Sequence, residues 1–250
     1  MIKVAIYGKG GIGKSTVTSG ISAALGLNGH NVMQLGCDPK TDSTINLLGG
    51  TPPPPILQYL QEHGKPETLD AIAQKGFGNV TCMEIGGPTP GVGCFGRGML
   101  TAFDLLDEMN AYDIYKPDVV LYDILADVVC GGIAVPMREG FADKVCIVTS
   151  GEKMALLAAE NIILALRNFA DRNYAELGGL ILNCRDMADE VERVKEFAHR
   201  MDTSIIGVIP RDTTIHKFEE EGKTIVEGDR TQPTSERFFD LARTIINFAE

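Results

Sequence analysis

The stretch that decides the fold is IKVAIYGKGGIGKS, residues 2–15. Its apolar start is typical of a buried strand, and a glycine-rich turn leads from it into a helical pattern. The turn matches the phosphate-binding pattern G-x-x-x-x-G-K-[ST], and this pattern requires a strand before it and a helix after it. Glycine lets backbone N–H groups converge on phosphate oxygens, and the helix N-terminus adds partial positive charge. We therefore predict an ATP-binding loop with the residues Gly8, Lys9, Gly10, Gly11, Ile12, Gly13, Lys14, Ser15 and Thr16.

Side chains in and near this loop indicate a magnesium site. Lys14 is placed to reach the β- and γ-phosphates, and the Ser15 hydroxyl is placed to bind Mg²⁺. Asp123 ends the apolar run VVLYD, where a carboxylate beside the phosphate loop can bind Mg²⁺ directly or through water. Asp38 similarly ends MQLGCD, although an aspartate at a strand end is often only a helix cap. We predict that Ser15 and Asp123 hold Mg²⁺.

Apolar runs rich in valine and isoleucine recur along the chain between helical patterns. The predicted strands lie near residues 2–7, 31–36, 79–85, 118–123, 144–149, 178–183 and 204–209. The predicted helices lie near residues 14–28, 99–110, 153–172, 188–201 and 235–249. Apolar runs that each lead into a loop and a helix predict a doubly wound α/β fold, with a mostly parallel sheet of about seven strands and helices on both faces.

One segment interrupts this alternation. It begins with TPPPP, residues 51–55, and continues as a polar run to residue 78, and we expect it to lie outside the sheet. No linker, repeat or low-complexity tail divides the chain, which predicts a single domain over residues 1–250. In a doubly wound sheet, ligands bind at the carboxyl ends of the strands, and the phosphate loop, Asp38 and Asp123 all follow such ends.

The composition excludes several classes of partner. The chain has 250 residues, of which 44% are apolar, and a net charge of −11. An acidic protein of this kind is not expected to bind nucleic acid or an anionic membrane surface. No apolar run reaches the length of a membrane span, and the phosphate loop lies too close to the N-terminus to leave room for a signal peptide. We expect a cytoplasmic protein.

Two cysteines stand in glycine-rich loops, Cys94 in GVGCFGRG and Cys130 in DVVCGG. No C-x-x-C spacing occurs, which argues against a zinc ribbon or a thioredoxin-type redox pair. Flanking glycines give N–H groups room to approach sulfur, and a helix predicted to begin near Gly98 would stabilise a thiolate or an anionic cluster at Cys94. Two thiolates are half of the ligands that an iron–sulfur cluster requires, and a twofold axis between two subunits would supply the rest. Buried, inert cysteines are the alternative.

The other cysteines fit a plainer role. Cys82, Cys146 and Cys184 lie in or beside strand-like runs, where cysteine is usually a small buried side chain. Cys37 follows a predicted strand and precedes Asp38, so we expect it to be buried as well. A cytoplasmic location keeps thiols reduced, and disulfides are therefore not expected.

Lys9 is a second lysine inside the phosphate loop. Such a side chain could simply be solvated, or it could cross a dimer interface and place its charge on the partner's nucleotide, as an arginine finger does. The form GKGGxGKS resembles the deviant Walker A loop of dimerising P-loop NTPases, a group that includes nitrogenase iron proteins, MinD, ParA and ArsA. This resemblance favours the role across the interface.

Four further segments closely resemble the nitrogenase iron protein family, the ATP-dependent reductases of nitrogenase and its relatives. They are GGPTPGVGCFGRG, DVVCGG, GCDPKTDST and SGEKMALLAAENI, and the resemblance covers essentially the whole chain. It implies a homodimer in which Cys94 and Cys130 of both subunits hold one 4Fe-4S cluster. It also implies that MgATP hydrolysis drives single low-potential electrons from a ferredoxin or flavodoxin donor to a separate nitrogenase-like catalytic protein.

The same resemblance assigns roles to further residues. Lys9, Asp38 and Asp127 take part in catalysis, with the two aspartates orienting the attacking water. Arg97 matches an arginine that is reversibly ADP-ribosylated in some members, close to the docking face for the partner protein. The residues that respond to the nucleotide or lie near its adenine are Lys40, Asp42, Asn183, Pro210, Arg211 and Asp212.

The spacing between Asp123 and Cys130 couples the two predicted sites. Cys130 follows seven residues after Asp123, so a nucleotide-dependent shift of this segment would move the cluster. Ala126 lies in that segment where family members usually carry glycine, and it could stiffen the switch.

Other functions stay open at this point. Within the family, the chain could be the reductase of nickel-tetrapyrrole (coenzyme F430) biosynthesis. From other classes, it could be a MinD- or ParA-like organising ATPase, for which its acidic C-terminal segment is a poor fit. It could also be an iron–sulfur carrier ATPase, although such proteins typically place a C-x-x-C pair late in the chain, and that pair is absent here.

Overall fold

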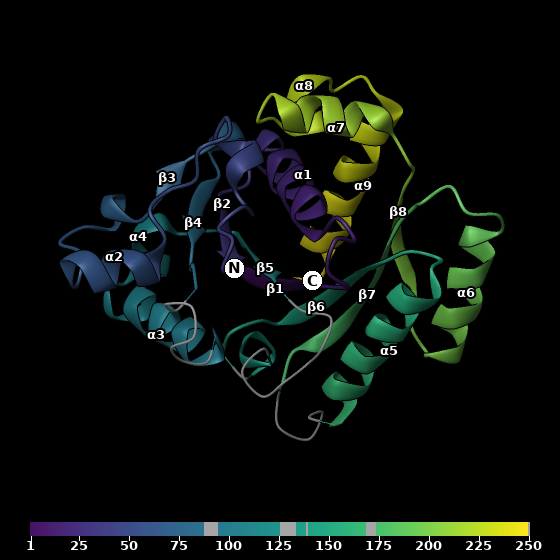
Figure 1. Ribbon diagram of the computed structural model, residues 1–250, viewed down its shortest axis with the longest axis horizontal. Helices are drawn as coiled ribbons and strands as arrows, with labels where there is room; N and C mark the ends of the chain where they lie inside the picture. The colour runs from purple at the N-terminus through teal and green to yellow at the C-terminus, as the bar shows by residue number, and fades with distance from the viewer. Residues whose placement is uncertain (88–94, 126–133, 139, 169–173, 250) are drawn as a thin grey trace.

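The computed structural model of this protein describes residues 1–87, 95–125, 134–138, 140–168 and 174–249 (Figure 1). The predictions made for Cys94, Ala126, Asp127 and Cys130 lie outside these residues. Within the described part of the chain, no helix is long and apolar enough to cross a membrane.

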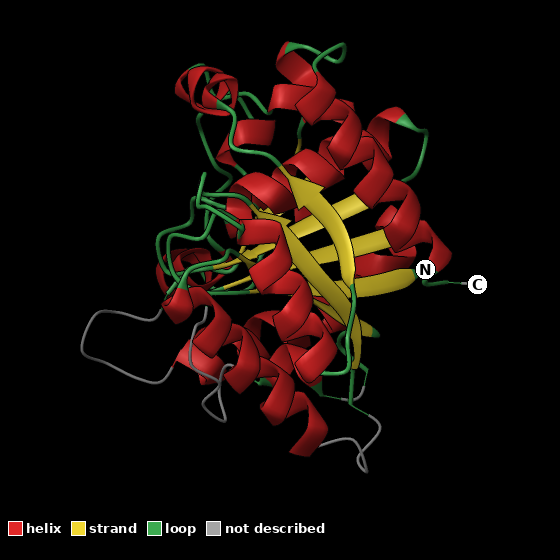
Figure 2. Ribbon diagram, turned by 90° about the vertical axis from the view of Figure 1, so that its right-hand side faces the viewer, coloured by secondary structure: helices red, strands yellow, loops and turns green. Residues whose placement is uncertain are grey.

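Eight strands form one sheet in the order β3-β4-β2-β5-β1-β6-β7-β8. They are β1 (Ile2–Tyr7), β2 (Val32–Cys37), β3 (Gln74–Lys75), β4 (Thr81–Glu84), β5 (Val119–Ile124), β6 (Lys144–Thr149), β7 (Glu176–Asn183) and β8 (Ile205–Ile209). Every neighbouring pair is parallel except β3 with β4. Helices cover both faces of the sheet, so the runs of valine and isoleucine are buried on both sides (Figure 2). The predicted fold class, a doubly wound α/β fold of the P-loop NTPase type, is confirmed.

The polar segment after TPPPP is the part that departs from the prediction. It contains α2 (Ile56–His63) and also β3, which pairs antiparallel with β4 at the edge of the sheet. This pairing raises the strand count from about seven to eight. Both residues of β3 are exposed, and so short a polar strand has no alternation of apolar and polar residues that a sequence pattern could reveal.

All five predicted helices are present, as α1 (Lys14–Leu27), α3 (Phe95–Glu108), α5 (Lys153–Asn168), α6 (Glu190–Arg200) and α9 (Pro233–Asn247). Besides α2, three short helices were not predicted, α4 (Ala111–Tyr115), α7 (Thr213–Glu220) and α8 (Ile225–Gly228). Helix α3 begins at Phe95, earlier than the expected start near Gly98.

The helices form two layers. Helices α1 and α9 lie side by side on one face of the sheet, with α7 and α8 beyond them, while α3, α5 and α6 cover the other face (Figure 1). Each layer has its own apolar core, with Phe238 of α9 buried on the first side and Phe103 of α3 on the second. The phosphate loop, between β1 and α1, therefore opens at the carboxyl edge of the sheet, where β2, β5, β7 and β8 also end.

Candidate nucleotide-binding site

The phosphate loop has a backbone that only glycine can adopt at its two ends. Gly8 has a φ of +146°, and a Cβ on it would lie 2.3 Å from the carbonyl oxygen of Val148 in β6. Gly13 precedes α1 with a φ of +96°, and its Cβ would lie 2.5 Å from Nδ2 of Asn183. Close packing against β6 and β7, together with the positive φ, thus explains why the loop carries glycine at these positions.

The two lysines of the loop differ in their surroundings. Lys14 is buried, and its Nζ donates to the carbonyl oxygen of Lys9 at 3.3 Å, so its ammonium group spans the loop. Lys9 is half-buried, and its own Nζ lies 3.5 Å from the carbonyl oxygen of Gly10. The ammonium group of Lys14 is thus buried across the loop, whereas that of Lys9 is more exposed.

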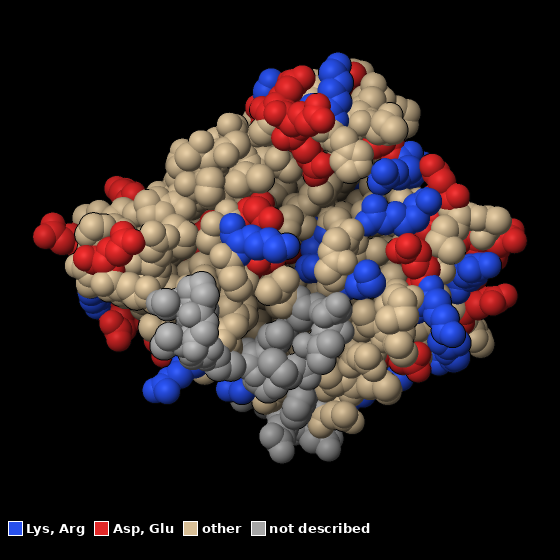
Figure 3. All heavy atoms as spheres, viewed as in Figure 1, with Lys and Arg blue, Asp and Glu red and all other residues tan. Residues whose placement is uncertain are grey.

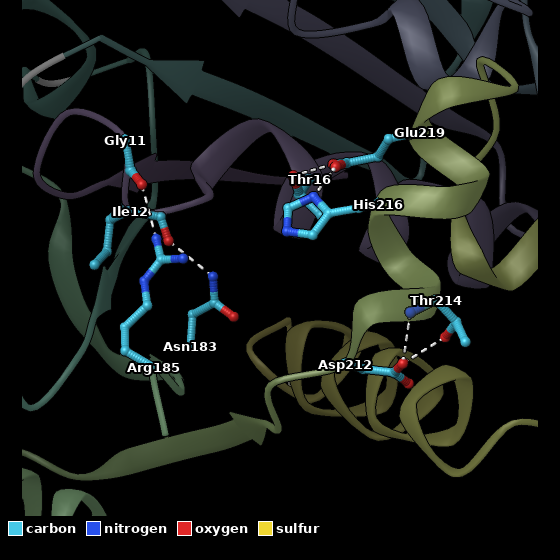
Figure 4. Close-up of polar contacts among 9 residues, drawn as sticks. All are labelled: Gly11, Ile12, Thr16, Asn183, Arg185, Asp212, Thr214, His216 and Glu219. Carbon is cyan, nitrogen blue, oxygen red and sulfur yellow. Dashed lines mark hydrogen bonds and ion pairs between the residues drawn. The ribbon is translucent and has the colours of Figure 1, made fainter. Parts of the chain in front are cut away.

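The end of β7 braces the phosphate loop from the side (Figure 4). Asn183 Nδ2 donates to the carbonyl oxygen of Ile12 at 2.8 Å, and Arg185 Nη2 donates to that of Gly11 at 2.7 Å. Tying down these carbonyls favours a loop whose N–H groups face the phosphates. Asn183 was predicted to lie near the adenine. The bracing role of Arg185 was not predicted, and the only sequence signal is a cation two residues after a strand end.

Asp123 and Ser15 form a pair of hard oxygen ligands. The Asp123 carboxylate is 2% exposed and accepts hydrogen bonds from the hydroxyls of Ser15 and Ser43. Burial raises the pKa of Asp123, although these hydrogen bonds and the Lys14 ammonium act in the opposite direction. A serine hydroxyl beside a buried carboxylate suits Mg²⁺, so the residues present fit the predicted ion.

The loop after β2 supplies the second wall of the site. Asp38, Lys40 and Asp42 line the same cleft as the phosphate loop, and the cleft has a volume of about 330 Å³, at the lower end of small-molecule sites. Asp38 Oδ1 accepts a hydrogen bond from the backbone N–H of Lys40 at 2.8 Å, so its carboxylate closes a turn within its own loop. These predicted residues are therefore brought together with the phosphate loop.

The far end of the cleft is formed by the turn between β8 and α7. Pro210, Arg211 and Asp212, which the sequence resemblance places near the adenine, line it. Asp212 also caps α7, because its Oδ1 accepts from the Thr214 N–H at 2.8 Å (Figure 4). Its Oδ2 accepts from the Thr234 hydroxyl of α9 at 2.6 Å. Partial burial alone would raise the pKa of Asp212, but the hydrogen bonds outweigh burial and lower it. Asp212 thus connects the turn at this end of the cleft to α7 and α9.

Helix α7 closes the cleft with side chains that the sequence did not single out. Glu219 Oε1 accepts a hydrogen bond from the Thr16 hydroxyl of the phosphate loop. The second oxygen of Glu219 lies 3.1 Å from Nδ1 of His216, one turn earlier in the helix (Figure 4). The cleft therefore joins elements from both ends of the chain around one loop.

The comparisons with known proteins agree with this geometry. Residues 2–250 match the model of the family described as 4Fe-4S iron sulfur cluster binding proteins, NifH/frxC family. The chain belongs to this family.

Solved structures of other proteins share the fold. MinD, the cell division ATPase of Pyrococcus furiosus, is 23% identical with a TM-score of 0.76, and the match covers 99% of each chain. MinD of Aquifex aeolicus is also 23% identical, with a TM-score of 0.75 over 99% of this chain and 97% of that one. Cobyrinic acid a,c-diamide synthase of Mycobacterium smegmatis, solved with an ATP analog and magnesium, is 17% identical with a TM-score of 0.71 over 100% and 96%. These identities support the shared fold alone.

Cys94 and Cys130, the predicted cluster ligands, lie outside the described residues. In the described part of the chain, no group of three or more His, Cys, Asp or Glu side chains is placed to hold a metal ion. Cys37, Cys82 and Cys146 are buried, as predicted, whereas Cys184 is only half-buried. Burial raises the pKa of all these thiols, to about 12 for Cys82 and Cys146, which disfavours the thiolate form that ligates metals.

Arg97 does not line the nucleotide cleft. It is exposed in the first turn of α3, and its carbonyl oxygen accepts a hydrogen bond from Thr101. On the face that Figure 3 shows, the basic side chains over α5 and α6 alternate with acidic ones. That face offers a mixed surface rather than a continuous basic one.

Proposed function

We propose that this protein is the ATP-dependent reductase component of a nitrogenase or nitrogenase-like complex. In this proposal a homodimer holds one 4Fe-4S cluster through Cys94 and Cys130 of both subunits. MgATP hydrolysis drives single electrons from a ferredoxin or flavodoxin to a separate catalytic protein. The observation that carries the proposal is the family match over residues 2–250, which includes both glycine-flanked cysteines and the complete phosphate loop.

At the nucleotide, each residue of the cleft has a distinct task. Bound Mg²⁺ would neutralise charge on the β- and γ-phosphates, held by Ser15 and Asp123. Lys14, whose Nζ donates to the Lys9 carbonyl, exchanges this contact for phosphate oxygens when the nucleotide binds. Asp38, with Asp127, orients the attacking water, and Lys9 contacts the nucleotide of the other subunit.

The position of α3 supports a cluster at Cys94. The helix begins at Phe95, directly after this cysteine in the chain, and continues for 14 residues. A helix N-terminus stabilises a thiolate and a negatively charged cluster, and α3 begins earlier in the chain than the sequence pattern predicts, at the residue that follows Cys94. Asp123 lies at the end of β5, seven residues before Cys130, so the segment after β5 is the route from nucleotide to cluster.

Anaerobic purification with iron and acid-labile sulfide analysis tests the cluster. We expect about four irons per dimer in the wild type and almost none in Cys94→Ala or Cys130→Ala. Cys184→Ala is the matched control, because this half-buried cysteine lies outside the proposed ligand set. A colourless, iron-free wild type, or a Cys94→Ala protein with full iron content, would contradict the proposal.

The electron-transfer step needs a separate test. An iron chelator added under reducing conditions should remove iron faster in the presence of MgATP than of MgADP, because the segment after β5 links the two sites. Affinity capture with a non-hydrolysable ATP analogue should recover the catalytic protein. A nickel-tetrapyrrole reductase as the captured protein would assign the chain to coenzyme F430 biosynthesis within the same family.

An organising ATPase is the second candidate, and the similarity to MinD of Pyrococcus furiosus is the observation that favours it. Such a protein binds a membrane or DNA in an ATP-dependent manner, which would require a basic amphipathic helix or a basic patch. Co-sedimentation with anionic liposomes and with DNA separates the candidates. ATP-dependent binding to either, by an iron-free protein, would favour this second function.

A further inference from the structure

Glu84, the last residue of β4, is a buried carboxyl group at the carboxyl end of a strand that lies next to the edge of the sheet. It is fully buried, and its Oε1 accepts hydrogen bonds from both the backbone N–H and the hydroxyl of Thr44, each at 2.7 Å. Its Oε2 is buried and has no hydrogen-bond partner within the part of the chain that the structure describes. Burial of a carboxyl group is unfavourable, and it raises the pKa of Glu84 to about 7. A buried carboxyl group that is this unfavourable for folding suggests a role in the site nearby.

The strand register places Glu84 in line with Asp123. Glu84 of β4 lies opposite Gly36 of β2, and Gly36 lies opposite Asp123 of β5. A Cβ on Gly36 would lie only 1.8 Å from Oε2 of Glu84 and 2.7 Å from Cβ of Ser43. Glycine at this position thus leaves the space that the carboxyl group and the Ser43–Thr44 turn occupy, directly beside the strand that carries Asp123.

Ser43 connects this buried carboxyl group to Asp123. Gln34 Nε2 donates to the carbonyl oxygen of Ser43 at 2.9 Å and to its hydroxyl oxygen at 3.0 Å. The Ser19 hydroxyl of α1 donates to the same carbonyl at 2.8 Å. Since the Ser43 hydroxyl already accepts from Gln34, its own proton is directed to the Asp123 carboxylate, which accepts it. The turn is thus fixed by Glu84 at Thr44 and by Gln34 and Ser19 at Ser43.

We propose that Glu84 is a positioning residue of the Mg²⁺–nucleotide site. By fixing Thr44 it holds the Ser43 hydroxyl on Asp123, and so sets the orientation in which the Asp123 carboxylate faces Ser15 and the metal. Glu84 itself touches neither nucleotide nor metal. The inference rests on the nucleotide part of the proposed function and does not involve the cluster. Hydrogen-bonding partners behind a metal-binding carboxylate typically contribute a tenfold to hundredfold effect on metal affinity.

The test compares two replacements of Glu84. Glu84→Met fills the space but accepts no hydrogen bond from Thr44, whereas the amide oxygen of Glu84→Gln can accept both bonds at the Oε1 position. Binding of ADP to the purified full-length protein is measured by calorimetry, once with Mg²⁺ and once with a chelator. Glu67→Gln, which removes an exposed carboxylate, is the control for charge alone.

We expect Glu84→Met to weaken the Mg²⁺-dependent part of ADP binding about tenfold, with metal-free ADP binding retained and with Glu84→Gln close to the wild type. Equal Mg²⁺ dependence in Glu84→Met and wild type would overturn the proposal. An equal loss with and without Mg²⁺ would also overturn it, because it would show a purely structural role. A Glu84→Gln protein as impaired as Glu84→Met would show that charge, and not the contact with Thr44, matters.

A second variant keeps the proposal testable if Glu84→Met does not fold. Thr44→Val removes only the hydroxyl that donates to Glu84, and we expect a loss of about fivefold in the Mg²⁺-dependent part of ADP binding, the size of one hydrogen bond. A Thr44→Val protein with the Mg²⁺ dependence of the wild type would refute the inference. The assay needs no iron, so it tests the role of Glu84 even if anaerobic iron analysis finds no cluster and thereby contradicts the reductase function.

Discussion

The buried carboxyl group of Glu84 makes a quantitative prediction about the pH dependence of stability. Burial raises its pKa from 4.5 to about 7, and this difference corresponds to about 3 kcal/mol. Below pH 4.5 the folded and unfolded states are both protonated at this site. Between 4.5 and about 7 the unfolded chain releases the proton while the folded chain retains it, so the free energy of unfolding falls as the pH rises. Above pH 7 the loss is complete and constant.

Glu84→Gln isolates this contribution because glutamine has nearly the same size and shape as glutamate but no carboxyl group that can titrate. The assay is urea unfolding of both proteins between pH 5 and pH 8, without nucleotide or Mg²⁺, followed by circular dichroism. All other groups titrate in both proteins, so we expect the stability of Glu84→Gln relative to wild type to rise by about 2 to 3 kcal/mol across this range.

An infrared titration checks the same group directly. The wild type should contain a protonated carboxyl group that disappears with a midpoint near pH 7 and is absent from Glu84→Gln. Glu67→Gln, which removes an exposed carboxylate, is the control in both measurements for the loss of a carboxylate as such. A stability difference between Glu84→Gln and wild type that does not change with pH would refute the reasoning.

Three further substitutions test the walls of the nucleotide cleft. Arg185→Met removes the donor to Gly11 and should weaken ADP binding about tenfold by calorimetry, whereas Arg193→Met on the exposed side of α6 should not. Gly13→Ala combines a strained φ with a Cβ 2.5 Å from an Asn183 nitrogen, and should lower stability by at least about 1 kcal/mol and abolish ADP binding. Asp212→Ala removes the cap of α7 and should cost about 1 kcal/mol of unfolding free energy at pH 7. Because the folded-state pKa of Asp212 is lowered, the cost should vanish as the pH falls through it, and a difference that persists in acid would contradict this.

The elements that the sequence predicted are those with a local signal. The phosphate loop combines required glycines with a strand and a helix in fixed order, and the valine- and isoleucine-rich runs reveal the parallel strands. Strand β3 escaped prediction because its two exposed residues are defined only by pairing with β4. Helix α7 was not predicted because it spans only eight residues, of which Ile215 alone is buried.

The missed site residues share a different cause. Arg185 and Glu219 act through contacts with residues far away in the chain, and only the fold brings them to the loop. Glu84 carried a signal, a glutamate inside the apolar run VTCMEI, but its partner Thr44 and its relation to Asp123 depend on the strand register. Spacing along the chain can identify the type of a site, whereas the contacts that orient its side chains depend on the folded structure.

Native mass spectrometry of the anaerobic protein tests the central claim most directly. The account predicts a dimer that carries the mass of a single cluster with about four irons and four sulfides, and this added mass should be lost in Cys94→Ala and in Cys130→Ala. A dimer without inorganic mass, or a monomer that carries a cluster of its own, would contradict the claim that two subunits share one cluster.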